Sequence, residues 1–239
     1  MINGWYQVLI KSKFMSLEGV IRKMKDTLFP IFCVGCNVEG TFCCRECLNK
    51  FKANKIIEID FETNKQERAV YLDKLTALFN YKKYEDIQEL IHLFKYEYCE
   101  ELSSVWQELY QNLFDFKFDY DLIIPVPLHS RRKRERGFNQ SEVLSLALLD
   151  GFKKRGSRTG INIKDLKRTR YTSQQIHLSG KDREKNLKDV FVWVGDSLEE
   201  KTILLIDDVY TTGATLNESA KVLKNRGSKR VDCLVLAKD

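Results

Sequence analysis

The stretch "ILLIDDVYTTGAT", residues 203–215, constrains the fold more than any other part of the sequence. Its apolar run, Ile203 to Ile206, is too short for a typical helix and suits a strand buried on both faces, as in a parallel sheet. Beyond Gly213 the apolar residues recur at helical spacing, so the turn opens a helix. Asp207 and Asp208 are therefore expected at the carboxyl end of a strand, where open α/β sheets bind ligands.

The chemistry of this strand-turn-helix unit suits a sugar phosphate. Neighbouring carboxylates accept hydrogen bonds from a diol, and the free backbone N–H groups at the start of a helix bind a phosphate. In the alternative interpretation, the aspartates only cap the helix and the threonines are ordinary turn residues. The residues alone leave both interpretations open.

The organisation of the chain indicates an α/β protein. From Tyr120 onward, strand and helix signals alternate, which is typical of a parallel sheet flanked by helices. Strands are expected at 121–126, 161–163, 190–194, 202–207 and 231–237, and helices at about 139–154 and 214–226. Before them we expect an amphipathic helix at 1–30, strand-like pieces at 56–59 and 77–79, and a long helical pattern from Ile87 to Leu113. We expect helix 1–30 to pack on the protein's own core or on a partner, with membrane-surface binding as the alternative.

The bulk composition sets wide limits. A length of 239 residues suffices for one domain and a small module, and a net charge of +6 suits a phosphate-bearing ligand or nucleic acid without requiring one. No apolar run approaches the roughly 18 residues of a membrane span, and the N-terminus lacks the features of a signal peptide. We therefore expect a cytoplasmic protein whose seven cysteines do not form a disulfide framework.

Five of the seven cysteines lie between residues 31 and 48. Cys33, Cys36, Cys44 and Cys47 form two C-x2-C pairs, a spacing that can place four thiolates at the corners of a tetrahedron around zinc. Four thiolates leave no open coordination position, so the zinc is expected to be structural. Cys43 could replace Cys44 as the third ligand, and a redox pair is the alternative for one of the C-x2-C pairs.

Two basic segments are candidates for anion binding. The first places five cations near the expected carboxyl edge of the sheet: Arg131, Arg132, Lys133, Arg134 and Arg136. They suit a pyrophosphate or a nucleic-acid backbone, and a solvated charge run is the alternative. The second is the polar connection 167–191, which is long enough to close over a ligand. His177 within it could be a base or a phosphate ligand, or simply an exposed histidine.

The motifs occur in the order "FPIFCVGC", "CREC", "HLFKYEYCEEL", "PVPLHSRRKRERGFNQSEVL", "KRTRYTSQQIHLSGKDREKNLKDVF" and "ILLIDDVYTTGAT". This order resembles the ComF family of ComFC-type proteins, which are associated with natural competence. The resemblance covers roughly residues 28–239, and "RGFNQ" with "TTGAT" is its most specific part. Beyond the amphipathic helix expected at 1–30, it implies a four-cysteine zinc-binding module (31–50), a connecting or hood region (51–118) and a type I phosphoribosyltransferase-like domain (119–239). Residues 48–98 lack the second cysteine pair of many family members, so one zinc is expected.

The resemblance to type I phosphoribosyltransferases also implies a ligand, phosphoribosyl pyrophosphate (PRPP), together with Mg²⁺. Asp207 and Asp208 would hold the ribose hydroxyls and form the catalytic pair. The 5′-phosphate loop would consist of Val209, Tyr210, Thr211, Thr212, Gly213, Ala214 and Thr215. The pyrophosphate loop would include Pro127, Leu128, His129 and Arg131, and residues 168–188 would form a mobile catalytic loop.

Three functions fit the resemblance. The first is a competence-associated protein with a PRPP-binding domain that handles imported single-stranded DNA, its backbone contacted by the cations at 131–136. The second is an active phosphoribosyltransferase with an unidentified acceptor, in which Mg²⁺ and the arginines stabilise the departing pyrophosphate. The third is a regulator whose DNA affinity depends on PRPP. Proteins of the DNA-uptake machinery are candidate partners.

Overall fold

The computed structural model describes residues 30–64, 69–96, 99–110, 119–170 and 189–239. The chain divides into two compact units, residues 1–47 and 48–239. Nearly all of the expected helix at 1–30 lies outside the described residues, as do residues 171–188 of the expected mobile loop, including His177. Among the described helices, none is both long enough and apolar enough to cross a membrane.

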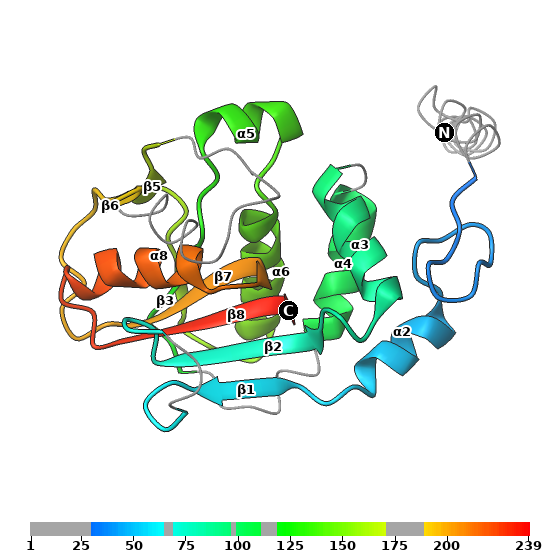
Figure 1. The fold of residues 1–239 in the computed structure, drawn as a ribbon, viewed down its shortest axis with the longest axis horizontal. Helices are drawn as coiled ribbons and strands as arrows, with labels where there is room; N and C mark the ends of the chain where they lie inside the picture. The colour runs from blue at the N-terminus through cyan, green and yellow to red at the C-terminus, as the bar shows by residue number, and fades with distance from the viewer. Residues whose placement is uncertain (1–29, 65–68, 97–98, 111–118, 171–188) are drawn as a thin grey trace, which may run out of the picture. The chain divides into compact units, whose positions relative to one another are not determined.

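The larger unit is built on a six-stranded sheet with the strand order β1-β2-β8-β7-β3-β4 (Figure 1). Its strands are β1 (Ile57–Asp60), β2 (Lys74–Asn80), β3 (Leu122–Pro125), β4 (Gly160–Ile161), β7 (Thr202–Tyr210) and β8 (Arg230–Lys238). Neighbouring strands are parallel except β1, which runs antiparallel to β2. The expected α/β class with a mostly parallel sheet is confirmed.

The central strands β7 and β8 are buried on both faces of the sheet. Residues Ile203 to Ile206 of β7 are at most 1% exposed, as their continuous apolar run predicts. Pro125, the last residue of β3, lies opposite Ile206 in the parallel register. The segments that follow β3 and β7 therefore leave the sheet at the same edge, beside Asp207 and Asp208.

Helices cover both faces of the sheet (Figure 1). Helix α8 (Ala214–Lys224) packs its apolar stripe into the core that contains Ile203 and Leu205. Helix α6 (Gln140–Lys154) packs against β3 and β7, with α4 (Cys99–Tyr110) beside it and α3 (Glu85–Tyr96) next to α4. The short helix α5 (Ser130–Arg136) precedes α6, and α2 (Arg45–Lys52) precedes β1.

The structure corrects three details of the sequence prediction. The strand expected at 190–194 is not part of the parallel sheet, because β6 (Phe191–Trp193) pairs antiparallel with β5 (Leu166–Arg168) in a separate two-stranded sheet. Phe191 and Trp193 are buried while Val192 is exposed, so this all-apolar run has only one core face. The helical pattern at 87–113 is divided between α3 and α4, and the basic segment forms α5, where no helix was predicted.

Candidate functional site

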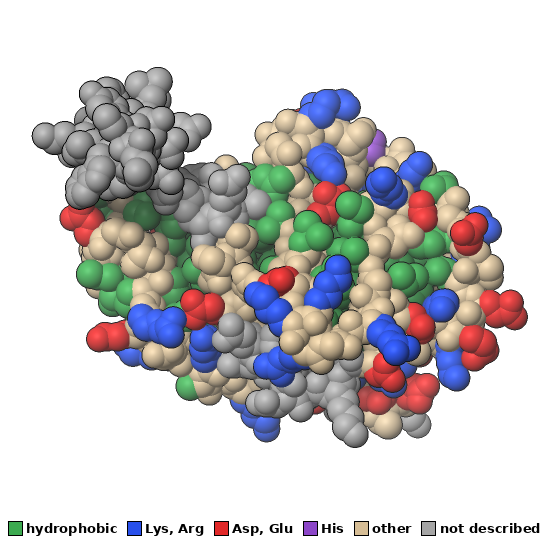
Figure 2. Space-filling view, turned by 180° about the vertical axis from the view of Figure 1, so that it is seen from behind, with side chains coloured by type: hydrophobic (Ala, Val, Ile, Leu, Met, Phe, Trp, Pro, Cys, Tyr) green, Lys and Arg blue, Asp and Glu red, His purple; other side chains and the backbone are tan. Residues whose placement is uncertain are grey.

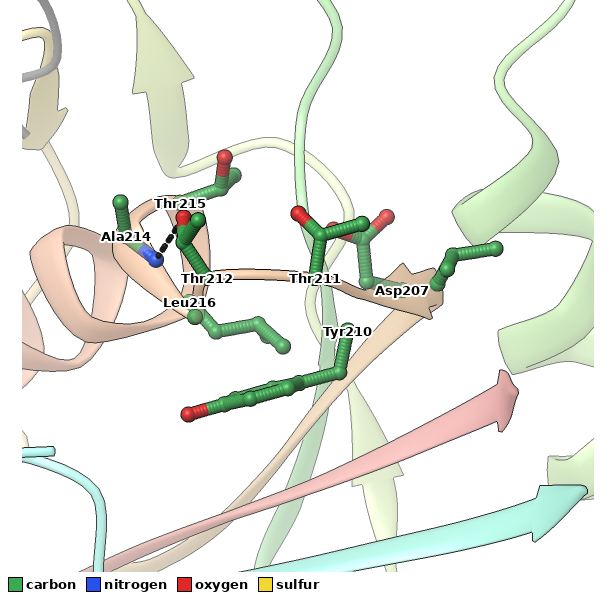
Figure 3. A pocket seen from close by; sticks show the side chains of 9 residues that line it. Asp207, Tyr210, Thr211, Thr212, Ala214, Thr215 and Leu216 are labelled. Atoms are coloured by element: carbon green, nitrogen blue, oxygen red, sulfur yellow. Dashed lines mark hydrogen bonds between the residues drawn. The ribbon is translucent and has the colours of Figure 1, made fainter. Parts of the chain in front are cut away.

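A pocket lies where β7 ends and α8 begins (Figure 3). Its empty space of about 220 Å³ includes open solvent at the mouth of the pocket. Its lining comes from the end of the strand, the turn and the start of the helix: Asp207, Val209, Tyr210, Thr211, Thr212, Gly213, Ala214, Thr215 and Leu216. The structure thus brings the predicted phosphate-loop residues together with Asp207, whereas Asp208 is not among the described residues that line the pocket.

The turn leaves backbone N–H groups of the helix without a strong cap. Gly213 is the N-cap residue of α8 and has no side chain that could accept a hydrogen bond. Thr212 Oγ1 lies 3.5 Å from Ala214 N, at the long limit for a hydrogen bond. The first turn of α8 is therefore a candidate anion site.

Glycine at position 213 is required for two reasons. Its φ of +72° lies in the left-handed region, which residues with a Cβ rarely adopt. A Cβ at this position would also clash with the ring and hydroxyl of Tyr210. Figure 3 shows this ring lying along the turn, so Tyr210 supports the turn from the core side.

Asp207 forms part of the pocket wall in a poorly hydrated position. Its Oδ1 accepts hydrogen bonds from Ser141 Oγ at 3.0 Å and from the Asp208 backbone N–H at 2.9 Å. Desolvation and the neighbouring charge of Asp208 raise the pKa of Asp207 to about 7, although these hydrogen bonds and Lys95 act in the opposite direction. Asp207 therefore changes protonation state near neutral pH, and only its ionised form accepts hydrogen bonds through both oxygens without donating.

Asp208 pairs with a lysine that is distant in the sequence. Lys95 Nζ lies 3.1 Å from Asp208 Oδ2, and the two side chains are only 21% and 18% exposed. Lys95 lies near the end of α3. The predicted connecting region at 51–118 therefore supplies a residue to the two carboxylates of Asp207 and Asp208, which we call the acid pair. Water and salt screen a pair this shielded less than they screen a surface pair.

Residues 136–141, "RGFNQS", connect α5 to α6 and organise the surroundings of the acid pair. Asn139 caps α6 by accepting a hydrogen bond from Ser141 N at 3.1 Å, and its amide donates to Val126 O at 3.1 Å. Gln140 Nε2 donates to Lys95 O at 3.1 Å. Asn139 and Gln140 are each only 1% exposed. This segment therefore ties the exit of β3 to α6 and to the end of α3.

The predicted pyrophosphate loop follows β3 and runs into α5. Pro127, Leu128 and His129 are partly exposed in this connection. His129 caps α5, because its Nδ1 accepts a hydrogen bond from the Arg131 backbone N–H at 3.2 Å. The Arg131 guanidinium pairs with Glu135 at 2.9 Å on the exposed side of α5. These residues share the sheet edge with the acid pair.

The other predicted nucleic-acid-binding cations of α5 have different surroundings. Lys133 Nζ lies 2.8 Å from a carboxylate oxygen of Glu142. Arg136 lies over the ring of Tyr96, with Cζ 4.9 Å from the ring centroid. Arg134 is exposed. In Figure 2, Lys and Arg side chains are spread over this face of the molecule, with Asp and Glu side chains among them.

Arg132 acts electrostatically on Arg168 of β5. Desolvation and the positive charge of Arg132 lower the pKa of Arg168, while the negative charge of Asp207 raises it. Arg168 therefore lies within electrostatic range of both Arg132 and the Asp207 carboxylate. Arg168 Cζ also lies 5.6 Å from the centroid of the Phe191 ring. Like charges held near each other beside a pocket favour an anionic ligand.

In the smaller unit, four cysteines form a candidate metal centre. The Sγ atoms of Cys33, Cys36, Cys44 and Cys47 all lie within 4.8 Å of one another. A tetrahedral zinc ion with Zn–S bonds of about 2.3 Å separates its sulfurs by about 3.8 Å, so the four residues fit zinc after small movements. The Cys43 thiol instead points to the Cys44 carbonyl oxygen at 3.8 Å and is outside the cluster.

One cysteine of the cluster, Cys33, has a lowered pKa, which favours its thiolate form. Burial raises the pKa of Cys33, but backbone hydrogen bonds from Cys44, Gly35 and Cys36 outweigh this and lower it to about 7. The Cys44 N–H, for example, lies 3.3 Å from Cys33 Sγ. The thiolate is the form that binds metals.

Comparison with known proteins identifies the family. A model described as "Phosphoribosyl transferase domain" matches residues 167–239. Competence protein F of Haemophilus influenzae is 34% identical over 183 residues, which cover 70% of this chain and 73% of that protein. The chain belongs to the ComF family.

Two further relatives match less of their own length. Competence protein ComFC of Bacillus subtilis is 28% identical over 165 residues, or 68% of this chain and 60% of that protein. DNA utilization protein YhgH of Escherichia coli (strain K12) is 35% identical over 118 residues, or 49% of each chain. This ComF family member therefore spans less than two thirds of these two relatives.

The structure of this ComF family member refines the predicted site in two ways. Val209 and Tyr210 are the last residues of β7, so the turn proper begins at Thr211. Lys95 and Ser141, which contact the acid pair, were not predicted. For Ser141 a signal existed, because it lies in the first turn of a helix that begins at the same sheet edge. For Lys95 no local pattern indicated the contact.

Proposed function

We propose that the protein binds PRPP with Mg²⁺ in the pocket at the end of β7, and that it handles imported single-stranded DNA in a competence-associated role. One observation carries the binding proposal: the weakly capped start of α8 and the Asp207 carboxylate line the same pocket. A single small ligand with both an anionic group and a hydroxyl group can use both features. A sugar phosphate has these groups, whereas inorganic phosphate lacks the sugar hydroxyls.

Each part of PRPP has a matching group in the protein. Its 5′-phosphate would accept hydrogen bonds from the turn at 211–214, and its ribose hydroxyls would donate to Asp207. Its pyrophosphate would be neutralised by Arg132 and Arg168 and by the start of α5. Mg²⁺ prefers oxygen ligands, and Asp207 and Asp208 offer carboxylate oxygens beside the pocket, so the residues fit this metal. When bound, Mg²⁺ supplies positive charge to the phosphate oxygens.

The proposed DNA-handling role is supported by family membership and by α5. The relatives are named Competence protein F, Competence protein ComFC and DNA utilization protein YhgH. Helix α5 presents Arg131, Lys133 and Arg134 at the surface of the larger unit. Cations on a helix bind the nucleic-acid backbone without sequence specificity and with a strong dependence on salt.

Isothermal titration calorimetry with PRPP and Mg²⁺ tests the binding proposal. We expect saturable binding by the wild-type protein and a loss of about tenfold or more in Asp207→Asn, because an ionised acceptor for the ribose hydroxyls is removed. The matched control is Asp150→Asn, which removes a half-exposed carboxylate paired with Lys154 at 2.6 Å in the last turns of α6. Wild-type protein that shows no binding at millimolar PRPP would contradict the proposal.

Fluorescence anisotropy with a labelled single-stranded oligonucleotide tests the DNA role. In the double variant Arg132→Ala, Arg134→Ala we expect weaker binding and a shallower salt dependence, by about 0.7 in the log–log slope for each phosphate that is no longer neutralised. The double variant Lys153→Ala, Lys164→Ala removes two exposed cations outside α5 and serves as the control. If the wild-type protein does not bind the oligonucleotide at low salt, the DNA role is rejected.

Catalysis is a second candidate function, favoured by the match of residues 167–239 to the phosphoribosyl transferase domain. An active enzyme would break the bond between ribose C1′ and pyrophosphate and form a bond from C1′ to an acceptor. A screen for pyrophosphate release with purines, pyrimidines and amines tests it, and turnover should be lost in Asp208→Asn. If PRPP binds but no acceptor gives turnover, the domain is a binding module.

A further inference from the structure

The exposed face of α3 carries two rings that the core does not use. Phe94 belongs to the buried face of this helix, whereas His92 and Tyr96, one turn apart, are both exposed. Their ring centroids are 4.9 Å apart. Within the described ranges the exposed Phe, Tyr or Trp side chains are Tyr96, at 54%, and Phe32 of the smaller unit. In the larger unit, Tyr96 is therefore the aromatic ring most available to a partner.

A cation from a distant part of the sequence contacts this ring. Arg136, the last residue of α5, places Cζ 4.9 Å from the centroid of the Tyr96 ring and donates a hydrogen bond from Nη2 to Tyr96 Oη at 3.3 Å. Between α5 cations and described acidic side chains, the ion pairs are those of Arg131 and Lys133, so no such carboxylate neutralises Arg136. We call His92, Tyr96 and Arg136 the aromatic platform.

Buried contacts hold the backbone of the platform in place. Phe138, two residues after Arg136, packs on Phe94, with ring centroids 6.1 Å apart. The buried amide of Gln140 donates to the carbonyl oxygen of Lys95, the residue before Tyr96. The ends of α3 and α5 are thus already joined. A ligand that binds there does not have to order them, which lowers the entropic cost of binding.

The surroundings of the platform favour an anionic polymer. Arg134, two residues before Arg136, is exposed on α5. An internal contact between ring and guanidinium would join α5 to α3, but it leaves Tyr96 more than half exposed and the Arg136 charge without an anion. A planar guanidinium beside an aromatic ring offers a stacking surface and a phosphate-binding charge in one place. Single-stranded nucleic acid has a group for each of them.

We propose that the aromatic platform is a stacking site for a base of single-stranded DNA, and that the cations of α5 bind phosphates of the same strand. This inference deepens the proposed DNA-handling role and rests on it for the identity of the ligand. Every base has a π face, so the site accepts a base without reading its sequence. An anionic partner without bases would use the cations alone.

Fluorescence anisotropy with two labelled probes of equal length tests the proposal. One probe is a thymidine oligonucleotide, and the other is an abasic oligonucleotide with the same sugar-phosphate backbone. At low salt we expect the wild-type protein to bind the thymidine probe about tenfold or more tightly than the abasic probe. Tyr96→Ala should weaken binding of the thymidine probe by about tenfold. It should leave the abasic probe and the salt slope unchanged, because no phosphate contact is removed.

Further variants separate stacking from other effects. Tyr96→Phe keeps the ring and should bind both probes like the wild-type protein. Arg136→Ala removes a cation as well as part of the platform, so it should weaken both probes and the thymidine probe more. The matched control is Leu146→Ala, which truncates an apolar side chain of α6 that is 52% exposed and should change neither affinity. If circular dichroism shows that Tyr96→Ala does not fold, Tyr96→Leu replaces it.

The outcomes distinguish this inference from the proposed function. If the wild-type protein binds both probes equally, or if Tyr96→Ala binds the thymidine probe as tightly as the wild-type protein does, the DNA role stands and the stacking site is overturned. An equal loss for both probes in Tyr96→Ala also overturns it, because the role of Tyr96 is then structural. If the wild-type protein binds neither probe at low salt, the DNA role fails and the stacking site fails with it. A loss confined to the thymidine probe supports both.

Discussion

Ser141 Oγ donates a hydrogen bond to Asp207 Oδ1 at 3.0 Å and thereby joins the first turn of α6 to the end of β7. Ser141 is only 3% exposed, so the bond is shielded from water. A hydrogen bond to the ionised form of a carboxylate lowers its pKa, so Ser141 counteracts the desolvation of Asp207. The charge state of the pocket near neutral pH therefore depends on the residue that follows "RGFNQ".

Replacing Ser141 by alanine should raise the titration midpoint of Asp207 and weaken PRPP binding severalfold, more at pH 6 than at pH 8. The free energy of unfolding should fall by about 1 kcal/mol, because a buried hydrogen bond is lost. Calorimetry and thermal unfolding measure both effects. The control is Ser145→Ala, which removes a buried bond to Ser141 O at 2.7 Å. It should cost similar stability with no change in pH dependence, and equal pH profiles in the two variants would exclude the role of Ser141.

Gly213→Ala should destabilise the protein by more than about 1 kcal/mol and abolish ligand binding at the turn. The alanine Cβ is disfavoured at a φ of +72° and clashes with Tyr210, so the turn must move. Gly156→Ala provides the matched control, because Gly156 also has a positive φ of +80° but has no atom within 4 Å of the added Cβ. Chemical denaturation should show a larger loss of the free energy of unfolding for Gly213→Ala than for Gly156→Ala. Equal losses in the two variants would mean that the clash with Tyr210 does not contribute.

Asp207→Asn should make the protein more stable at pH 8 while it weakens PRPP binding. The pKa of Asp207 is about 7 in the folded state, against an ordinary value of 3.8. Between about pH 4 and pH 7 the folded protein therefore keeps a proton that the unfolded chain releases, and stability is lost as the pH rises through this window. Asparagine keeps the oxygen that accepts the hydrogen bonds, and it removes the free-energy cost of ionising a buried carboxyl group.

Thermal unfolding of Asp207→Asn and wild type at pH 4 and pH 8 measures this effect. The two proteins should unfold at similar temperatures at pH 4, where Asp207 is protonated, and the variant should unfold at a higher temperature at pH 8. A variant that is less stable than wild type at pH 8 would show that the ionised carboxylate is not strained in the folded protein.

The cysteine cluster predicts one structural zinc ion per chain. Cys44→Ser removes a thiol of the cluster and should abolish zinc binding, whereas Cys43→Ser changes the adjacent cysteine outside the cluster and should retain it. Elemental analysis of the purified variants measures the zinc content. Chelation of zinc from the wild-type protein should unfold the region around residues 31–47, because metal binding supplies the folding free energy of such modules. If Cys44→Ser retains zinc and Cys43→Ser loses it, the zinc ligand is Cys43 and not Cys44.

The strand-turn-helix unit of the pocket was predictable because its signals are local. The apolar run of β7, the adjacent acids and the glycine of the turn follow one another in the sequence, and each has a direct physical meaning. The strand at 191–193 was wrongly assigned to the parallel sheet because that prediction also used only the local apolar run. Phe191, Val192 and Trp193 are all apolar, and only the tertiary structure leaves Val192 exposed.

The contact that Lys95 makes with Asp208 could not be predicted from local sequence patterns. The periodicity of α3 correctly predicted its buried face, which includes Ile87, Leu90, Ile91 and Phe94. Periodicity does not indicate which polar residue at the end of a helix will meet a charge from another strand. That contact depends on how the RGFNQS segment packs on α3, and this packing is a property of the folded chain.

The central claim is that a phosphate binds at the turn between β7 and α8. It is tested most directly by following the backbone amide resonances of Thr212, Gly213 and Ala214 while ribose 5-phosphate is added to isotope-labelled protein. The predicted result is a saturable shift of these amides that ribose alone does not cause. If these amides do not shift at saturating ribose 5-phosphate, the turn is not a phosphate site and the claim is contradicted.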